Sequence, residues 1–598
     1  MSANLQNALA ATLTLVLIAT VVVALTLSGD NGGPRRIEAG APPPTETPTL
    51  TNTPTPTATP TTTPTKAPEF NAVAKVITDA ADLIEGPLSR GRLGDYLLAN
   101  SEIQVVIQDI QRNIFSVGQF GGQILDADLV RVLSDPERDN FEEWAVGINL
   151  ENTAHYTKVN IINDGSNGKP AIIRVTGVDD LLDFINPSSQ VAGFGLPFPA
   201  AYDDVDLPVE VTTDYTLAPN DNFVRVDTTF KNTSGTLVET FITDYLSGSG
   251  EVEYFVPGYV FGEPLVTSGC ALCNFVALSG QGQADGVSYG YIHDIPESTV
   301  FSTSGVTIPA LGVAAALALI GGEDPNFAIE PNGGEVTVTH YFAVGDGNVG
   351  SIVDIRNTIL GLATGTIKGT ITRAGQPVEG ADVAVLGDQA DGPLELTKNV
   401  VSHYRTDAAG QYEGTLPPGD YTLQAHLDGH LAASPDPASV TVIDSSTTTQ
   451  DFTIPEAARV RVTIVDESNA AIAGKVSLVG FDPYPDPENT GTLLGFVDIR
   501  SALFGEVAKD RLPFGLAEVV FVDNLGDSGE FFIEPGTYRV VVSHGPEYSV
   551  FEQDITVTAG ALTTVSAQIA KVIDTTGFVS GDFHIHQLNS PDSAVTYE

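Results

Sequence analysis

Sulfur and positive charge are both scarce in this sequence. Its 598 residues include two cysteines and one methionine, and 27 Lys and Arg stand against 76 Asp and Glu, for a net charge of −49. So few cysteines exclude a small scaffold held together by many disulfides. A surface this acidic repels phosphate backbones and anionic lipid, which argues against nucleic-acid binding, and it attracts divalent cations.

The two cysteines form a Cys-Ala-Leu-Cys stretch, Cys270 to Cys273. A structural zinc site would need two further ligands, and no second pair of this kind or nearby histidine supplies them. A redox motif would begin a helix after a strand, whereas Gly269 and Asn274 indicate a loop on either side. The pair is therefore predicted to be a local disulfide or two loop thiols.

One long apolar run is present, near the N-terminus. Residues 8–27 are 20 uncharged, mostly apolar residues, enough to span a hydrocarbon core of ~30 Å as a helix rising ~1.5 Å per residue. No Lys or Arg precedes the run and no clear small-residue cleavage site follows it, so an uncleaved anchor is preferred over a removed signal. A buried core helix is the alternative. We predict residues 1–40 to be an anchor segment with its flank, and the chain to be tethered at the cell surface or secreted.

A stalk follows the anchor. Residues 41–68 contain 12 Thr and 9 Pro among 28 residues. Proline fixes φ and removes a backbone donor, so such a segment stays extended and builds no core. At ~3.1 Å per residue it reaches roughly 80 Å. Thr/Pro tracts of this kind are also frequent O-glycosylation substrates.

The remaining 530 residues are too many for one core, and their hydrophobic pattern is mainly β. Short alternating runs recur between turn signals, for example at residues 103–107, 171–175 and 223–227. Strict alternation of strands with helices is absent, which favours antiparallel sheets. The apolar run 306–320 is interrupted by Pro and Gly, so it is predicted to be a buried strand or short helix. We assign residues 69–365 to one large β domain.

Two parts of this domain resemble known families. Residues 94–100 and 121–128 resemble the front domain of some secreted bacterial metallohydrolases. Residues 214–217 and 229–235 resemble strands of the galactose-mutarotase-type supersandwich. The resemblance implies a large antiparallel β-(super)sandwich. The histidines of this domain match no catalytic motif and are predicted to be structural. They are His155, His293 and His340.

Residues 366–455 carry a clearer pattern. They contain Asp407-Ala-Ala-Gly-Gln-Tyr, which predicts a hairpin, and Pro418-Gly-Asp-Tyr before a strand in which Tyr421, Leu423 and Ala425 share one face. This pattern resembles the carboxypeptidase regulatory-like domain, a small seven-stranded prealbumin-like sandwich. The resemblance implies a carbohydrate-binding-like fold that serves either as a spacer, the preferred interpretation, or as a sugar-binding module.

A weaker copy follows at residues 456–570. Residues 535–540 repeat the Pro-Gly-x-Tyr pattern, and residues 528–531 repeat the hairpin pattern before it. The segment is therefore predicted to be a second regulatory-like sandwich that carries an insertion.

The last segment, residues 571–598, carries the most specific motif. As a strand, it would place His584 and His586 on one face, ~7 Å apart, where both imidazoles can reach one cation or two adjacent cations. Asp592 follows a Ser-Pro turn and would return a carboxylate to the same end. Asp582 is a candidate to accept a hydrogen bond from the ring N–H of one histidine and so to orient that ligand.

This motif resembles the first strand of the polymerase and histidinol phosphatase (PHP) family, most of all its CehA/McbA-type secreted members. The resemblance implies that His584, His586 and Asp592 bind a divalent metal (Zn, Mn or Fe), which activates water against a phosphoester or related bond. Only 12 residues follow His586, whereas a (β/α) barrel needs on the order of 200. We therefore expect the catalytic domain to be cut short and the chain, as given, to be inactive.

Two hypotheses remain open from the sequence. In the first, the chain is the exported, membrane-tethered front portion of a PHP-type metallohydrolase. In the second, it is a non-catalytic surface protein whose sandwiches bind glycans or adhere to other surface partners.

Overall fold

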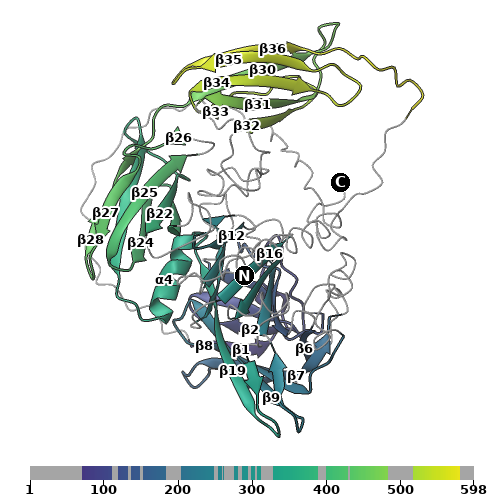
Figure 1. Cartoon of the computed structure of the whole chain (residues 1–598), viewed down its shortest axis with the longest axis vertical. Helices are drawn as coiled ribbons and strands as arrows, with labels where there is room; N and C mark the ends of the chain where they lie inside the picture. Colours follow the sequence, from purple (N-terminus) through teal and green to yellow (C-terminus); the bar gives the residue numbers. More distant parts are fainter. Residues whose placement is uncertain are drawn as a thin grey trace, which may run out of the picture.

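The computed structural model describes three successive β-sandwich bodies (Figure 1). The described residues are 71–110, 119–131, 136–148, 152–182, 204–240, 242–247, 253–258, 260–261, 275–279, 286–293, 298–303, 306–311, 327–387, 399–427, 431–482 and 516–578. The predicted anchor, the stalk, the cysteine pair and the histidine motif lie outside these ranges. The mainly β fold predicted from the sequence is confirmed.

The first body is a large antiparallel sandwich. Its strands are β1 (Val73–Val76), β2 (Tyr96–Ala99), β3 (Ile103–Ile107), β4 (Ile124–Leu129), β5 (Glu143–Ile148), β6 (Asn152–Asn163), β7 (Ala171–Leu181), β8 (Val209–Leu217), β9 (Phe223–Asn232), β10 (Val238–Thr240), β11 (Ile242–Ser247), β12 (Glu253–Val256), β13 (Val260–Phe261), β14 (Phe275–Ser279), β15 (Ser288–His293), β16 (Ser298–Thr303), β17 (Val306–Leu311), β18 (Phe327–Ile329) and β19 (Glu335–Gly345). A short 3-10 helix, η1 (Ala80–Asp82), follows β1, and the helix α4 (Val349–Ile359) follows β19.

Seventeen strands of this body pair in two runs, and β10 pairs with β18 in a separate two-stranded sheet. One run is β1-β2-β3-β4-β5-β11-β17-β16, and the other is β6-β7-β8-β9-β19-β15-β14-β12-β13. The runs are continuous because β5 also pairs with β6. Alternate residues face one shared apolar core, as in β8, where every second side chain from Val209 to Leu217 is buried. The interpretation of residues 306–320 as a strand or short helix is confirmed in part, since Val306–Leu311 form the strand β17.

The second body is a small two-sheet sandwich. Its strands are β20 (Gly365–Arg373), β21 (Gln376–Pro377), β22 (Asp382–Gly387), β23 (Val400–Arg405), β24 (Gln411–Leu416), β25 (Gly419–Leu427), β26 (Leu431–Ala432), β27 (Ala438–Val442), β28 (Thr447–Thr449) and β29 (Phe452–Thr453). One sheet is centred on β20 and the other on β22 and β25. Tyr421, Leu423 and Ala425 lie in the core between them, as predicted. Asp407 accepts hydrogen bonds from the N–H groups of Ala409 and Gln411, which closes the predicted hairpin.

The third body repeats this arrangement. Its strands are β30 (Ala458–Val465), β31 (Gly474–Asp482), β32 (Leu516–Val522), β33 (Phe531–Ile533), β34 (Gly536–Ser543), β35 (Phe551–Val557) and β36 (Leu562–Gln568). The sheets are β33-β30-β36 and β32-β31-β34-β35. The repeated Pro-Gly-x-Tyr pattern has one structural role in both bodies. Tyr421 donates its hydroxyl proton to the carbonyl of Pro417, and Tyr538 donates to that of Glu534, each over 2.7 Å.

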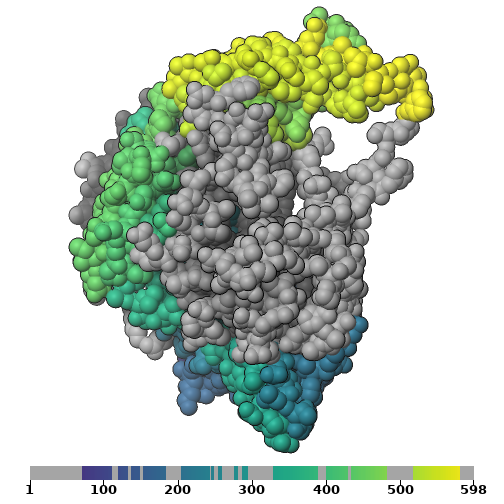
Figure 2. Space-filling model, viewed as in Figure 1, coloured from purple at the N-terminus to yellow at the C-terminus, as the bar shows by residue number. Residues whose placement is uncertain are grey.

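In both small sandwiches the first and last strands are parallel neighbours. β28 and β29 run parallel to β20, and β36 runs parallel to β30. The chain therefore enters each sandwich at one end and leaves it at the other. The third sandwich and the β7 and β9 strands of the large domain lie at opposite ends of the molecule's longest axis (Figures 1 and 2).

Candidate functional site

The residues that the sequence assigned to a metal site, His584, His586 and Asp592 with Asp582 beside them, lie outside the described residues, as do Cys270 and Cys273. Within the described ranges, no group of three or more His, Cys, Asp or Glu side chains could hold a metal ion. Within those ranges, too, no helix is long and apolar enough to cross a membrane. The described part of the chain offers a different candidate, a groove where the first two bodies meet.

The helix α4 builds one wall of this groove. Gly347 adopts φ +100°, which turns the chain out of β19, and Ser351 donates to the carbonyl of Asn348 over 2.7 Å at the start of the helix. Val349, Ile352 and Val353 recur at helical spacing and are all buried. Gly361, at φ +61°, follows the last turn and ends the helix.

An apolar cluster joins the two bodies across this helix. Ile352 and Val353 of α4 pack in one cluster with phenylalanines of β12 and β14, and with Ala384 and Val400 from the second sandwich. All of these side chains are buried. The two bodies cannot separate without exposing this shared apolar core to water, which costs free energy. They therefore form a firm joint.

Two glycines, one in each body, make room for one tyrosine ring at the joint. The ring of Tyr404, from β23, lies against Gly350 of α4 and Gly414 of β24. A Cβ atom at either glycine would lie 2.3 Å from ring carbons of Tyr404, closer than atoms can pack. Neither glycine has a positive φ, so both are required here for space rather than for backbone conformation.

Polar bonds complete the joint. Asp354 Oδ1 accepts from the backbone N–H of Thr415 at 2.6 Å and from its hydroxyl at 2.5 Å. Asn357 Nδ2 donates to the carbonyl of Thr415 at 3.2 Å, and Asn348 Oδ1 accepts from the N–H of Arg405 at 2.7 Å. Each partner pair connects the helix region to the second sandwich.

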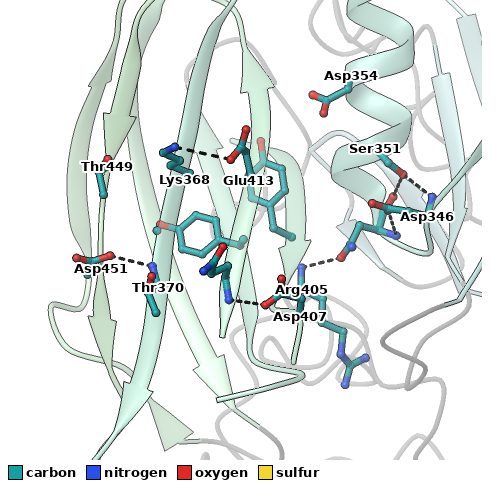
Figure 3. Close-up of a pocket in the computed structure, with 15 residues that line it drawn as sticks. Asp346, Ser351, Asp354, Lys368, Thr370, Arg405, Asp407, Glu413, Thr449 and Asp451 are labelled. Carbon is teal, nitrogen blue, oxygen red and sulfur yellow. Dashed lines mark hydrogen bonds and ion pairs between the residues drawn. The ribbon is translucent and has the colours of Figure 1, made fainter. Parts of the chain in front are cut away.

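The groove beside these bonds has a volume of about 540 Å³ and is acidic (Figure 3). Its walls come from α4 and the turn before it on one side and from β20 and β24 on the other. Two cations, Lys368 and Arg405, lie among five carboxylates, which are those of Asp346, Asp354, Asp407, Glu413 and Asp451.

Hydrogen bonds and one ion pair already engage these carboxylates. Asp346 accepts from the N–H of Asn348, and Asp451 accepts from the N–H of Thr370. Glu413 lies 4.0 Å from the ammonium of Lys368. Burial raises the pKa of Asp354 to about 6, and the negative charges of Asp346 and Glu413 add to this, against the opposing hydrogen bonds from Thr415. The carboxylates thus mainly tie strands and turns together.

The aromatic side chains of the groove are turned inward. Tyr404 is 2 % exposed and Tyr412 is 3 % exposed, and both belong to the core of the second sandwich. A sugar ring that binds by stacking needs an accessible aromatic face. The groove therefore presents carboxylates and amides to a ligand rather than ring faces.

A second polar cluster lies inside the large sandwich. Tyr291 donates to Asp244 Oδ2 over 2.7 Å, and His340 Nδ1 lies 3.3 Å from the same oxygen. Burial raises the pKa of Asp244 to about 8 and, with the nearby His293, lowers the pKa of His340 well below its usual value. Burial thus favours the neutral form of both groups. Trp144 packs against Tyr291 and His340, with ring centroids 5.2 and 5.9 Å away.

Two further histidines in the described residues contact aromatic rings and carboxylates. His155 stacks on Phe120 at 4.0 Å and pairs with Asp180. His403 is buried edge-on against Phe261, with its Nε2 3.4 Å from Asp382 Oδ1, and burial lowers its pKa to about 3. The expectation of structural histidines agrees with these contacts, although the nitrogens of His340 make no hydrogen bond within the described residues.

Comparison with known proteins identifies one domain. The carboxypeptidase regulatory-like domain family matches residues 366–455, as predicted for this segment. No curated protein sequence matches the chain significantly. The family match covers the second sandwich only, and no comparison bears on the PHP resemblance, which stays a prediction.

Several solved structures show local likeness. The shaft pilin SpaA of Lactobacillus rhamnosus GG is 13% identical over 36% of this chain and 100% of its own, with a TM-score of 0.22. A streptococcal ancillary pilin is 14% identical over 46% of this chain and 80% of its own, with a TM-score of 0.21. The minor pilin GBS52 of Streptococcus agalactiae is 14% identical over 36% of this chain and 100% of its own, with a TM-score of 0.20. Scores this low establish no shared overall fold or function.

Sequence reasoning missed the joint. It predicted no helix at residues 349–359 and singled out neither Tyr404 nor Asp354. One signal was available: apolar residues at positions 349, 352 and 353 followed by Gly361 match a short amphipathic helix with a glycine stop. Its partners could not be found, because they come from strands far along the chain on both sides of the helix, from β12 to β24.

Proposed function

We propose that this chain is a non-catalytic cell-surface protein whose β bodies form a stiff spacer. The observation that carries the proposal is the parallel pairing of first and last strands in both small sandwiches. Antiparallel first and last strands would return the chain to its starting end. Parallel ones carry it forward, so that the bodies are connected in series.

Strand lengths give the scale of the spacer. β20 has nine residues and β30 has eight, and at ~3.3 Å per residue each sandwich advances the chain by about 25–30 Å. No flexible linker separates the two, since Ala457 is buried in the core of the second sandwich and Ala458 in the core of the third. The joint at α4 fixes the large domain to the second sandwich in the same way.

The predicted segments before residue 69 supply the base of this spacer. In the proposal, residues 8–27 tether the chain to the membrane and residues 41–68 raise the sandwiches above the surface. Glycans or other surface partners would then be met by the outer bodies. Cleavage by protease added to intact cells would test this placement, and full protection of the sandwiches would contradict it.

Stiffness is tested by single-molecule FRET in the full chain. After Cys270 and Cys273 are replaced by Ser, dyes on cysteines at the exposed Lys158 and Thr556 span both joints. We expect one narrow distance distribution, which widens in Gly350→Val because the new side chain forces Tyr404 out of the joint. A matched glycine control, Gly235→Ala, meets its nearest atom at 3.8 Å and is expected to leave the distribution unchanged. A wide distribution in the unmodified chain would contradict the proposal.

A second candidate function rests on residues 581–593. Their Gly-Asp-x-His-x-His pattern with Asp592 supports a metal-dependent hydrolase of the PHP type, for which Zn, Mn or Fe bound by His584 and His586 would activate water. The test is the metal content of the purified chain by mass spectrometry. Bound metal lost in His584→Ala and retained in Gln587→Ala supports this candidate, whereas no bound metal in the unmodified chain counts against it.

A further inference from the structure

The chain leaves the third sandwich at the end opposite to the one where it arrived, because β36 runs parallel to β30. Two backbone hydrogen bonds hold the start of the departing segment at this end. The N–H of Ile569 donates to the carbonyl of Val465, and that of Ser549 donates to the carbonyl of Ala570. The start of the departing segment is therefore held against the turn that precedes β35, and its last described residues, 576–578, are exposed.

One residue pins the departing segment. The backbone carbonyl of Glu547 accepts from the N–H groups of Val572 at 2.8 Å and Ile573 at 3.1 Å. The carboxylate of Glu547 accepts from the hydroxyl of Thr575 at 2.8 Å and pairs with the ammonium of Lys571 at 3.0 Å. Four contacts to a single residue fix the direction in which the chain continues.

Large apolar side chains are exposed at this pinned end. We call them the exit patch, and with their exposed fractions they are Val550 (56 %), Val572 (62 %), Ile573 (50 %) and Phe578 (81 %). Two other exposed aromatics of this body differ in kind, since Phe521 lies under Lys475 and Phe532 under Arg373 as cation–π pairs. Exposed apolar side chains on one part of a soluble domain are a feature of docking surfaces.

We propose that the exit patch is the docking surface for the segment of this chain that begins at residue 579. Phe578 belongs to the patch, so the next residues start in contact with it. The Glu547 contacts hold residues 571–575 in place, so the point from which the following segment continues is fixed near the patch. Residues 579–588 supply complementary chemistry, because they include Val579, Leu588 and, in alternation with polar residues, Phe583 and Ile585.

The inference concerns where this segment packs, and it is independent of whether its histidines bind metal. It adds a third firm joint to the two of the spacer: the third sandwich would hold the segment in a fixed orientation, as α4 holds the second sandwich. Hydrophobic contact of this kind excludes water from amide groups in the docked segment, which makes hydrogen exchange the direct measurement.

The test compares amide hydrogen exchange in the full chain and in the double variant V572S/I573S. We expect peptides within residues 579–598 to exchange at least tenfold faster in the variant, while peptides of β30 and β34 keep their protection. The matched control is Ile443→Ser, which changes a side chain of nearly equal exposure (61 %) in the second sandwich and is expected to change nothing in residues 579–598.

Phe578→Ser provides a second variant in case the double variant unfolds the third sandwich, since a side chain that is 81 % exposed contributes little to that core. The same increase in exchange is expected. Unprotected exchange of residues 579–598 in the unmodified chain would overturn the proposal. It would also be overturned if the variants abolished self-association without altering exchange, which would assign the patch to a second copy of the chain.

Discussion

At the scale of single residues, the groove at the joint contains a titrating group with a structural task. Asp354 accepts two hydrogen bonds from Thr415 and thereby connects α4 to β24. Its pKa in the folded chain, about 6, lies above the ordinary value of 3.8. Burial in an acidic groove thus works against the charge that the hydrogen bonds favour.

Stability should therefore depend on pH through this residue. Because the folded pKa is raised, the contribution of Asp354 to stability is complete below about pH 4 and is lost as pH rises through 6. Asp354→Asn removes the charge, so at pH 7.5 the free energy of unfolding of the variant should exceed that of the original chain by at most about 3 kcal/mol. The weaker hydrogen bonds of the amide reduce this gain. Urea unfolding at pH 4.5 and pH 7.5 measures the difference, and an equal difference at both values would contradict the assignment.

Single residues also show what could be read from the sequence. Tyr421, Leu423 and Ala425 were assigned to one buried face, because period-2 alternation is a local property of a strand. Tyr404 lies in β23, where five consecutive residues are buried, and its task depends on Gly350, which is 54 residues earlier. The closeness of that contact depends on tertiary packing, which no local pattern encodes.

At the scale of elements, the helix α4 decides how the first two bodies sit together. Ile352 is fully buried in the shared apolar cluster. Ile352→Ala should lower the free energy of unfolding by about 2–5 kcal/mol, since it removes buried methyl groups and leaves a cavity. Thr358→Ala, on the exposed side of the same helix, should change it by less than about 0.5 kcal/mol. Equal effects of the two substitutions in urea unfolding would show that the cluster does not hold the joint.

The elements also mark where prediction from sequence ended. Strands, hairpins and the repetition of the small sandwich follow from alternation and turn residues, which are local. The parallel pairing of β36 with β30 joins residues more than 90 positions apart, and the carboxyl groove exists only once β24 and α4 have met. The proposed metal ligands remain predictions from a motif alone.

At the scale of the whole molecule, charge is the dominant property. A net charge of −49 on the chain repels itself in the compact state, and added salt screens such repulsion over a Debye length that falls from ~30 Å at 0.01 M to ~10 Å at 0.1 M. The temperature of unfolding should therefore rise by several degrees between 0.01 M and 0.3 M NaCl. Calorimetry measures this rise, and an unfolding temperature that does not change with NaCl would contradict the screening argument.

The parallel strands of the small sandwiches have a mechanical consequence. A pull on the chain between its start at residue 458 and its end at residue 568 acts along β30 and β36 in opposite directions. Seven registered residue pairs join these strands, from Arg459 with Leu562 to Val465 with Gln568. Under such shear the hydrogen bonds share the load and must break together, whereas hairpin strands pulled from their open end separate one pair at a time. The fold is thus suited to bear tension along its length.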